Sequence, residues 1–567
     1  MASTLPRLSV RQVGAVAALL VAVAIAFFWG LGTIGLIDET EPLFAEAARQ
    51  MYATGDWITP YFNGVTRFDK PPLVYWAMAV GFHLFGVSAW SVRLPSALAA
   101  AGLTVFSFLT LQRYGHTTPQ LPTRPVAFII AATAGATAMA LHPETLVWAR
   151  SGVSDMLLSG CMGGALLCFF WGYAQGGKTG WYYAAYVLVA LAVLAKGPVG
   201  IVIPGLIVTV FAIYLGQVLP LARELQLLRG MLLVLLLTVP WFVAVTAIHG
   251  QTYIDSFFGY HNYERFTDVV NGHAAPWYFY FAVVAVGFLP WSPGLPFAMV
   301  RLRPWSVGYW RSQSRENQLG LFALIWFLVI FCFFTAAVTK LPSYVLPLMP
   351  AAAILVGLMW AAPYQRGTLF SAVASVITFA LLAVASYLTP RWLGGDPVMP
   401  DFPRLVQESG AMTRGATVWG AAAAAGLLLL LARRVRWLWA VSAAAFAVFT
   451  ITSVLPVAAI ADSQRQLPLR QLAQTAVEQR QPDETLAMVG FMKPSLVFYT
   501  QQSVLYIYSP DSETLRAVGQ ALVVGHPEEI AQAAGEQPKE ILQTAGTYQL
   551  ARIQFTDSET PSSLAAE

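Results

Sequence analysis

Long apolar runs constrain this chain more than any other feature of its sequence. About thirteen runs, each of roughly 17 to 25 residues, are apolar enough to cross a bilayer as helices. They cover residues 13–37, 90–111, 125–142, 156–174, 181–195, 198–216, 231–248, 277–299, 319–338, 344–361, 368–388, 416–432 and 437–460. The sequence therefore predicts a mainly α, polytopic membrane protein with about thirteen transmembrane helices.

Composition agrees and excludes a soluble globular protein. Hydrophobic residues make up 57% of the chain and charged residues 11%, whereas about a quarter of an ordinary globular domain is charged. The formal net charge is only +4 over 567 residues, and the basic residues form no stripe, so no nucleic-acid partner is expected. The cysteines lie within apolar runs and predict no disulfide framework. They are Cys161, Cys168 and Cys332.

The distribution of Lys and Arg predicts the orientation. The first apolar run follows Arg7 and Arg11, is longer than a signal-peptide core and has no cleavage site after it, so we expect it to remain in the membrane. With a cytoplasmic N-terminus, the cytoplasmic loops are rich in Lys and Arg and contain few acids, as the positive-inside rule requires. The first loop, residues 38–89, is then exported, and an odd number of spans exports the C-terminus as well.

The chain changes character at about residue 462. The short apolar runs "ETLAMVGF", "SLVFYT" and "QALVVGH" are typical of buried strands, and they alternate with the helical stretches "PLRQLAQTAVEQR" and "PEEIAQAAGE". We predict a transmembrane domain over 1–461, a small extracytoplasmic α/β domain over 462–555 and a disordered tail over 556–567. The small domain contains no catalytic pattern and is interpreted as a substrate-access or stability module.

The first exported loop is much longer than a simple connection requires. "EPLFAEAARQMYATG" has helical spacing, with Pro42 in its first turn and Asp38 or Thr40 as the expected cap. A second stretch, "LVYWAMAVGFHLFG", is apolar but too short to span a bilayer. Both stretches predict helices lying along the membrane surface.

Acids and bases collect at the predicted exported ends of the spans, and few lie in mid-span. We call this set the exported rim: Asp38, Glu39, Asp69, Lys70, Arg150, Asp155, Lys196, His261, Glu264, Arg265 and Lys340. Ionised groups near the bilayer centre would favour a transporter. Ionised groups at headgroup depth favour an enzyme that acts on a lipid headgroup.

Each member of the exported rim also has a structural interpretation. Lys196 and Lys340 end apolar runs, where lysines commonly extend to the interface. Arg150 could pair with Asp155, and Asp38 could serve only as a helix cap. The cluster around His261 could simply decorate a loop, because one His and one Glu are too weak a signal for a metal site.

The first loop resembles that of the bacterial aminoarabinose transferases and their relatives in the protein O-mannosyltransferase superfamily. The resemblance rests on "IDETEPLFAEAARQMYATGDWITPYFNGVTRFDKPPLVYW", supported by "SGVSDMLL", "AKGPVG", "HNYERF" and "KLPSYVLPLMPA". It covers roughly residues 10–360. It implies a multi-pass glycosyltransferase of the GT-C type in the bacterial inner membrane, which moves a sugar from a polyprenyl-phosphate donor to a lipid, glycan or protein acceptor on the extracytoplasmic face.

The chemistry of this reaction assigns roles to the rim. Negative charge grows on the departing phosphate, so cations must face it, and Lys70 is the first candidate. Asp38 is the expected general base for an acceptor hydroxyl, Asp155 is a second catalytic carboxylate, and by resemblance the transfer inverts the anomeric centre. The remaining residues expected to bind the donor or substrate are Glu39, Asp69, Arg150, Lys196, His261, Arg265, Lys340 and Tyr344.

Three questions stay open at this stage. Some GT-C enzymes use a divalent cation and others do not, and no cofactor is predicted here. Aminoarabinose transferases typically carry an arginine three residues after the loop aspartate, whereas this chain has Glu41, which reverses a charge beside the expected site. A flippase or transporter of lipid-linked sugars is the alternative, although that class favours inverted repeats and broken polar helices, and no clear repeat is found.

Overall fold

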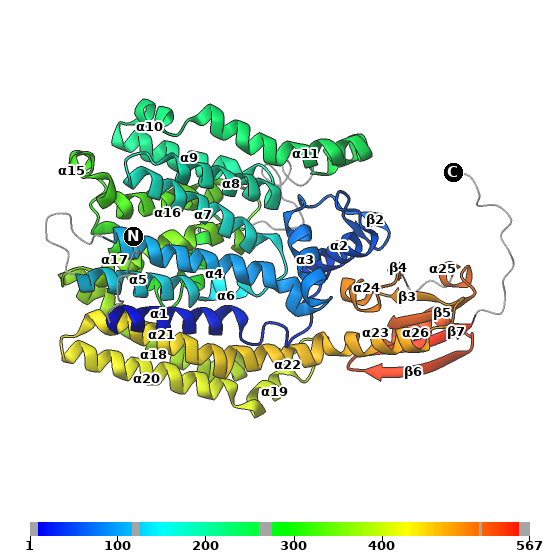
Figure 1. Cartoon of the computed structure of the whole chain (residues 1–567). Coiled ribbons are helices and arrows are strands. Elements are labelled where there is room, and N and C mark those ends of the chain that lie inside the picture. The colour runs from blue at the N-terminus through cyan, green and yellow to red at the C-terminus, as the bar shows by residue number, and fades with distance from the viewer. Residues whose placement is uncertain (1–9, 116–124, 258, 260–274, 510–512, 555–567) are drawn as a thin grey trace.

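Helices that run side by side form most of the molecule (Figure 1). The computed structural model describes residues 10–115, 125–257, 259, 275–509 and 513–554. The longer helices of this helical bundle are α1 (Val10–Val23) continued by the π-helix η1 (Ala24–Phe28), α4 (Ala89–Tyr114), α5 (Pro125–Ala140), α7 (Ser154–Ala174), α8 (Thr179–Lys196), α9 (Val199–Leu215), α11 (Leu227–Ile254), α16 (Leu319–Ala336), α17 (Met349–Ala361), α18 (Arg366–Trp392), α20 (Ala411–Leu431), α21 (Leu438–Phe449) and α22 (Leu455–Arg465).

Shorter pieces join or extend these helices. They are α6 (Pro143–Ala149), α10 (Val218–Glu224), α13 (Phe279–Gly287), η3 (Ser292–Gly294), α14 (Leu295–Val300), α15 (Val307–Ser312), η4 (Arg315–Gln318), η5 (Pro342–Leu348), α19 (Phe402–Ser409), η6 (Val435–Trp437) and the π-helix η7 (Thr450–Val454). Every range predicted to span the membrane overlaps one of these apolar helices or helix pairs.

The number of spans is lower than predicted when length is applied strictly. Within the described ranges, nine helices are long and apolar enough to cross a bilayer, or ten if the bent pair Phe279–Gly287 and Ser292–Val300 is one span. Other predicted spans correspond to shorter apolar helices, such as Val199–Leu215. The count of thirteen is therefore not confirmed, whereas the mainly helical membrane fold is.

The first loop contains the two predicted helices. They are α2 (Thr40–Thr54) and α3 (Leu73–Phe85), joined through the hairpin of β1 (Tyr61–Phe62) and β2 (Val65–Thr66). Gly55 ends α2 in a left-handed conformation (φ 75°), which glycine adopts without a side-chain penalty. The predicted cap is wrong. Glu39 occupies the cap position, no side chain bonds there, and the carboxylate of Asp38 points elsewhere.

A small mixed sheet follows the helical bundle, and we call residues 466–554 the C-terminal unit. Its elements are α23 (Leu467–Gln479), β3 (Thr485–Val489), α24 (Pro494–Thr500), β4 (Leu505–Ile507), α25 (Glu513–Arg516), β5 (Gln520–Gly525), α26 (Pro527–Ala534), β6 (Lys539–Ala545) and β7 (Tyr548–Gln554). The strand order is β4-β3-β5-β7-β6, parallel from β4 to β5 and antiparallel beyond.

One element of the C-terminal unit differs from its prediction. The runs "ETLAMVGF" and "QALVVGH" form β3 and β5 as expected, but "SLVFYT" is helical, in α24. Pro494 opens this helix with its fixed φ, and an apolar run this short looks the same in a buried strand and a buried helix. The predicted boundaries at 461 and 555 stay predictions.

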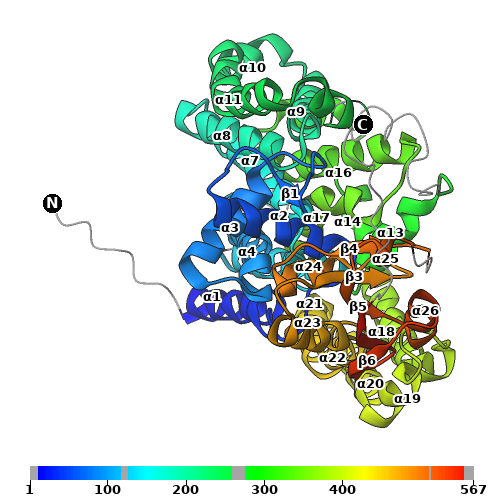
Figure 2. The ribbon, with the colours of Figure 1, turned by 90° about the vertical axis from the view of Figure 1, so that its right-hand side faces the viewer.

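The first loop and the C-terminal unit lie at the same end of the helical bundle. Figure 1 places α2, α3 and the sheet together, opposite α10 and α15, and Figure 2, which looks onto that end, shows α24 next to α2. A hydrogen bond from Ser495 to Asp38 joins the two regions directly. Their common side agrees with the predicted topology, while the direction in which that side faces remains a prediction.

Candidate active site

A cavity of about 280 Å³ lies among the first loop, α7, the α8–α9 turn, α16 and η5. Apolar side chains such as Ile203 and Phe334 line most of it, and Val202, also in the lining, is 49% exposed. The apolar part therefore reaches the outer surface of the helical bundle. The polar lining consists of Asp69, Lys70, Lys196, Thr339, Ser343 and Tyr344.

Helix boundaries place the two lysines of this cavity. Lys70 ends the loop before the two prolines that precede α3, which begins at Leu73. Lys196 is the last residue of α8, because Gly197 leaves the helix with a φ of 84°. The "FDKPP" and "AKGPVG" sequences thus hold both ammonium groups at helix boundaries.

Each lysine of the cavity forms an ion pair with a carboxylate. Lys70 Nζ lies 2.6 Å from Asp69 Oδ1, and Lys196 Nζ lies 2.6 Å from Asp155 Oδ1. Asp155 also interacts electrostatically with Lys70, so the two lysines converge on it. Lys196 Nζ further lies 5.4 Å from the centroid of the Tyr344 ring. The predicted Lys70, Asp69, Asp155, Lys196 and Tyr344 are therefore brought together.

Arg150 does not join this group. The considered pairing with Asp155 is wrong, because Arg150 donates to the carbonyl oxygens of Ala26 (3.3 Å) and Gly30 (2.9 Å), where the first span ends. Burial away from water lowers the pKa of Arg150 to about 10. Its contacts are those of a residue that fixes the path of the backbone.

Asp38 lies at the C-terminal unit and is not among the described residues that line the cavity. Its Oδ1 accepts a hydrogen bond from the backbone N–H of Ser495 (2.9 Å), and its Oδ2 accepts one from the Ser495 hydroxyl (2.5 Å). Burial raises the pKa of Asp38 to about 6, although these bonds and the charge of Lys493 oppose the rise. Asp38, predicted as the base, therefore does not line the cavity that contains Lys70, and it lies instead where the first loop meets the C-terminal unit.

The remaining predicted residues are dispersed. Glu39 is largely exposed and lies 3.4 Å from Lys493 Nζ, while buried Lys340 donates to the Ala337 carbonyl. His261 and Arg265 lie outside the described residues. Among the residues that the structure does describe, no three His, Cys, Asp or Glu side chains gather as metal ligands would.

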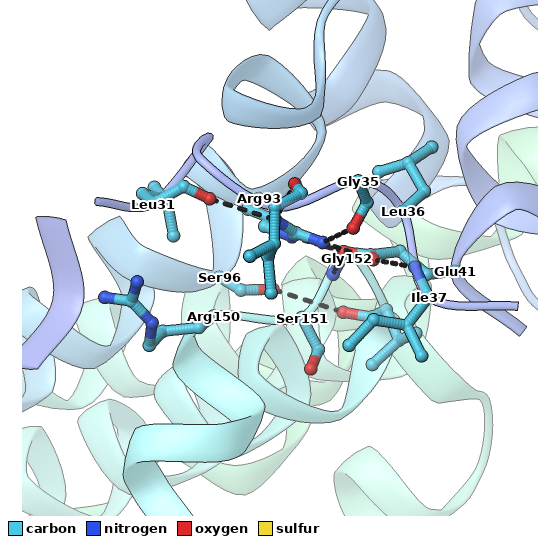
Figure 3. Close-up of polar contacts among 12 residues, drawn as sticks. Leu31, Gly35, Leu36, Ile37, Glu41, Arg93, Ser96, Arg150, Ser151 and Gly152 are labelled. Carbon is cyan, nitrogen blue, oxygen red and sulfur yellow. Dashed lines mark hydrogen bonds and ion pairs between the residues drawn. The ribbon is translucent and has the colours of Figure 1, made fainter. Parts of the chain in front are cut away.

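A second charged cluster, centred on Arg93, was not predicted (Figure 3). The Arg93 guanidinium, 1% exposed, forms a bidentate pair with Glu41, with both N···O distances at 2.8 Å. It also donates to the carbonyl oxygens of Leu31 and Gly35, and Glu41 accepts hydrogen bonds from backbone N–H groups of the same region. An arginine inside the apolar run 90–111 was the available signal, because such a charge needs a buried partner.

Two family models match parts of the chain. Residues 69–243 match the model described as dolichyl-phosphate-mannose-protein mannosyltransferase. This range includes both lysines of the cavity. Residues 479–566 match the C-terminal domain of cyanobacterial RgtA-type glycosyltransferases.

Curated relatives include undecaprenyl phosphate-alpha-4-amino-4-deoxy-L-arabinose arabinosyl transferases. The protein from Shewanella sediminis is 30% identical over 363 residues, which are 63% of this chain and 62% of the relative. The protein from Edwardsiella ictaluri is 26% identical over 506 residues, 86% of this chain and 84% of the relative. The chain thus spans about three fifths of the first of these relatives and most of the second.

The crystal structure of ArnT from Cupriavidus metallidurans bound to undecaprenyl phosphate has the same fold. It superposes with a TM-score of 0.79 at 24% identity, covering 95% of this chain and 98% of that protein. The family models, the relatives and this fold together support an aminoarabinose transferase-like GT-C superfamily. The helical bundle, first-loop helices and C-terminal unit of this chain together make up the GT-C architecture.

The exchange at Glu41 has a structural explanation. The family pattern predicts an arginine at this position beside the active site. The side chain of Glu41 instead joins α2 to α4, where it pairs with Arg93, and it accepts a hydrogen bond from the N–H of Gly152 at 2.7 Å. The reversed charge is therefore neutralised within the protein and does not face the cavity.

Proposed function

We propose that this chain is a multi-pass glycosyltransferase of the bacterial inner membrane. It moves a sugar from a polyprenyl-phosphate donor to an acceptor on the extracytoplasmic face. The observation that carries the proposal is the cavity, in which two lysines stand beside an apolar surface that extends to the outside of the helical bundle. A phosphate joined to a prenyl chain has this combination of charge and apolar length.

The lysines supply the electrostatic part of the reaction. As the bond from the anomeric carbon to the phosphate oxygen breaks, its electron pair stays on the phosphate, which becomes more negative. A unit charge 4 Å away is worth about 4 kcal/mol at an effective dielectric of about 20. Lys70 and Lys196 are already oriented by Asp69 and Asp155, so little reorganisation accompanies the developing charge.

Asp38 takes the proton of the acceptor in this proposal. The acceptor oxygen bonds to the anomeric carbon on the face opposite the leaving phosphate, which inverts that centre, and its proton passes to the carboxylate. A pKa of about 6 suits a base that is ionised at neutral pH and can still hold a proton. Since Asp38 contacts the C-terminal unit, the acceptor approaches from that side, away from the apolar surface.

The transfer assay tests the activity. Purified protein in lipid nanodiscs is incubated with radiolabelled polyprenyl-phosphate sugars, including the aminoarabinose derivative, and with extracted envelope lipids and glycans. Label that moves covalently to an acceptor supports the proposal. Label that crosses between leaflets of proteoliposomes without transfer supports a flippase instead.

A binding assay tests the site. We expect Lys70→Met to weaken binding of undecaprenyl phosphate at least about 100-fold, since one close charge pair is removed. Lys539→Met is the matched control, because Lys539 is an exposed lysine on β6. Equal affinity in the two variants would remove Lys70 from the donor site. Mass spectrometry of envelope lipids with and without the protein then identifies the sugar and acceptor.

A further inference from the structure

Side chains of α22 and of the C-terminal unit form hydrogen bonds with the segment between the first span and α2. The N–H of Gly35 donates to Asp462 Oδ1 (2.7 Å), and the N–H of Leu36 donates to the hydroxyl of Tyr499 (2.8 Å). These partners are 427 and 463 residues away in sequence. A segment without regular structure must find partners for its buried N–H groups, and here the C-terminal unit and the helix before it provide them.

The same unit surrounds the carboxylate of Asp38. Ser495 donates its N–H to Oδ1 and its hydroxyl to Oδ2. The amide of Gln466, oriented to satisfy its neighbours, donates to Oδ2 at 3.0 Å and accepts the N–H of Asp38 at 3.2 Å. An ionised carboxylate has about four acceptor positions, and these bonds use three of them. Among the residues that the structure describes, no donor takes the remaining position on Oδ1.

We propose that Ser495 is a positioning residue that fixes both oxygens of Asp38 so that the remaining position on Oδ1 receives the acceptor proton. Gln466 assists it through a further hydrogen bond to Oδ2. The C-terminal unit is then part of the active site, in place of the access or stability module that its sequence suggests. This inference rests on the proposed function, because it assigns Asp38 the role of the base.

Other ionisable groups around Asp38 also shift its pKa. Lys493 stabilises the ionised form and Glu39 opposes it, and the hydrogen bonds from Ser495 also favour the ionised form. Removing the Ser495 hydroxyl therefore raises the pKa of Asp38. Titratable groups on the elements around this site include Glu41 and Glu46 of α2, Asp462 and Arg465 of α22, Arg470 of α23, Tyr499 of α24, Tyr506 of β4 and Tyr548 of β7.

The test is the pH dependence of transfer by Ser495→Ala in the full-length protein in nanodiscs. We expect kcat to fall roughly 10-fold with little change in KM for the donor, because a hydrogen bond to a charged group is lost away from the cavity. The acidic limb of the pH profile moves to higher pH, since the base must be ionised. Ser495→Thr keeps the hydroxyl and restores both values.

Asn63→Ala is the matched control. Asn63 exchanges two hydrogen bonds of 2.8 Å with the backbone of Val504, which also join the first loop to the C-terminal unit but do not involve Asp38. This variant loosens the contact between the two regions and leaves the acidic limb in place. If Ser495→Ala is not recovered folded, Gln466→Met removes another donor to Asp38 and moves the limb in the same direction.

The outcomes separate the two proposals. Transfer by the wild-type protein, together with an upward move of the limb only in the Ser495 and Gln466 variants, supports the inference. Transfer by the wild type with equal losses and no move of the limb in Ser495→Ala and Asn63→Ala overturns the inference alone. No transfer by the wild type overturns the proposed function and this inference with it.

Discussion

The Arg93 cluster and the charged lining of the cavity each contain acidic and basic side chains. Both lie near the same end of the helical bundle, and they differ in what surrounds them. Arg93 and Glu41 are 1% and 4% exposed, and their polar atoms are bonded to each other and to backbone groups. The lysines of the cavity are paired as well, but they line open space beside an apolar surface. The first cluster joins elements of the fold, whereas the second can receive a ligand.

A charged side chain at a membrane interface does not by itself identify a ligand-binding site. Arg150 belongs to the exported rim, yet its guanidinium donates to the backbone of the first span. The useful distinction is whether the donors and acceptors of a charged group are directed at the protein or at a cavity. Mutations should therefore separate the two clusters by what they change, either folding or ligand binding.

The largest effect on stability is expected in the Arg93 cluster. Arg93→Met leaves Glu41 buried without its ionic partner, which costs about 3–5 kcal/mol of folding free energy. We expect a large fall in the thermal unfolding midpoint, or loss of folded protein, measured by fluorescence during heating in detergent.

Arg404→Met is the control for Arg93→Met. Arg404 also forms ion pairs, with Asp401 and Glu408, but all three side chains are more than half exposed. Such pairs contribute little to stability. If both arginine variants unfolded at the same temperature, the Arg93 cluster would not have the structural role assigned to it.

In the second cluster, ligand affinity is expected to change more than stability. Lys196→Met removes one of the two cations of the cavity and should weaken binding of undecaprenyl phosphate by roughly 100-fold, about 3 kcal/mol. In this variant Asp155 keeps its electrostatic interaction with Lys70. The unfolding midpoint of Lys196→Met should therefore fall much less than that of Arg93→Met. Isothermal titration and thermal unfolding of the same sample measure both. A loss of stability without a loss of affinity would contradict the distinction between the clusters.

The sequence predicted one of the clusters and not the other. Lys70 and Lys196 stand in short motifs at the ends of apolar runs, so local pattern and resemblance were enough to find them. Arg93 lies inside a run that was interpreted as a span, and its partner Glu41 is 52 residues earlier in the chain. No local pattern specifies a contact of that kind.

The contact of Asp38 with Ser495 was equally invisible, because the two residues are 457 positions apart. The sequence indicated a helical membrane protein with surface helices in its first loop, since apolar length and helical spacing are local properties. It did not indicate that α24 is helical or that the C-terminal unit packs against that loop. Both depend on tertiary contacts.

Asp38 is buried and hydrogen-bonded like the Arg93 cluster, yet it is proposed to act on a substrate like the lysines of the cavity. Its titration should make the free energy of unfolding depend on pH. Its pKa is raised from 3.8 to about 6, so the folded protein holds the proton more tightly than the unfolded chain. Stability is therefore lost as the pH rises from about 4 to above 6, by about 3 kcal/mol in total at roughly 1.4 kcal/mol per pKa unit. Asp38→Asn does not ionise and avoids this loss.

The measurement for Asp38 is the difference in unfolding midpoint between Asp38→Asn and wild type from pH 4 to pH 8. We expect the difference to move in favour of Asp38→Asn as the pH rises. Asp401→Asn, at an exposed carboxylate, should give a difference that does not change with pH in this way. A flat difference for Asp38→Asn would mean that the environment of Asp38 does not disfavour its ionised form.

The smallest effect concerns how closely the Arg93 cluster is packed. A Cβ on Gly152 would lie 2.3 Å from Val92 Cγ1 and 3.1 Å from Glu41 Oε1, so Gly152→Ala must displace side chains of the cluster. We expect a loss of about 1–3 kcal/mol. Gly102→Ala is the control, because nothing lies within 4 Å of a Cβ there and alanine favours the helix. If thermal unfolding gave both variants the same midpoint, Gly152 and Val92 would be free to move apart, and the cluster would not be as closely packed as these distances indicate.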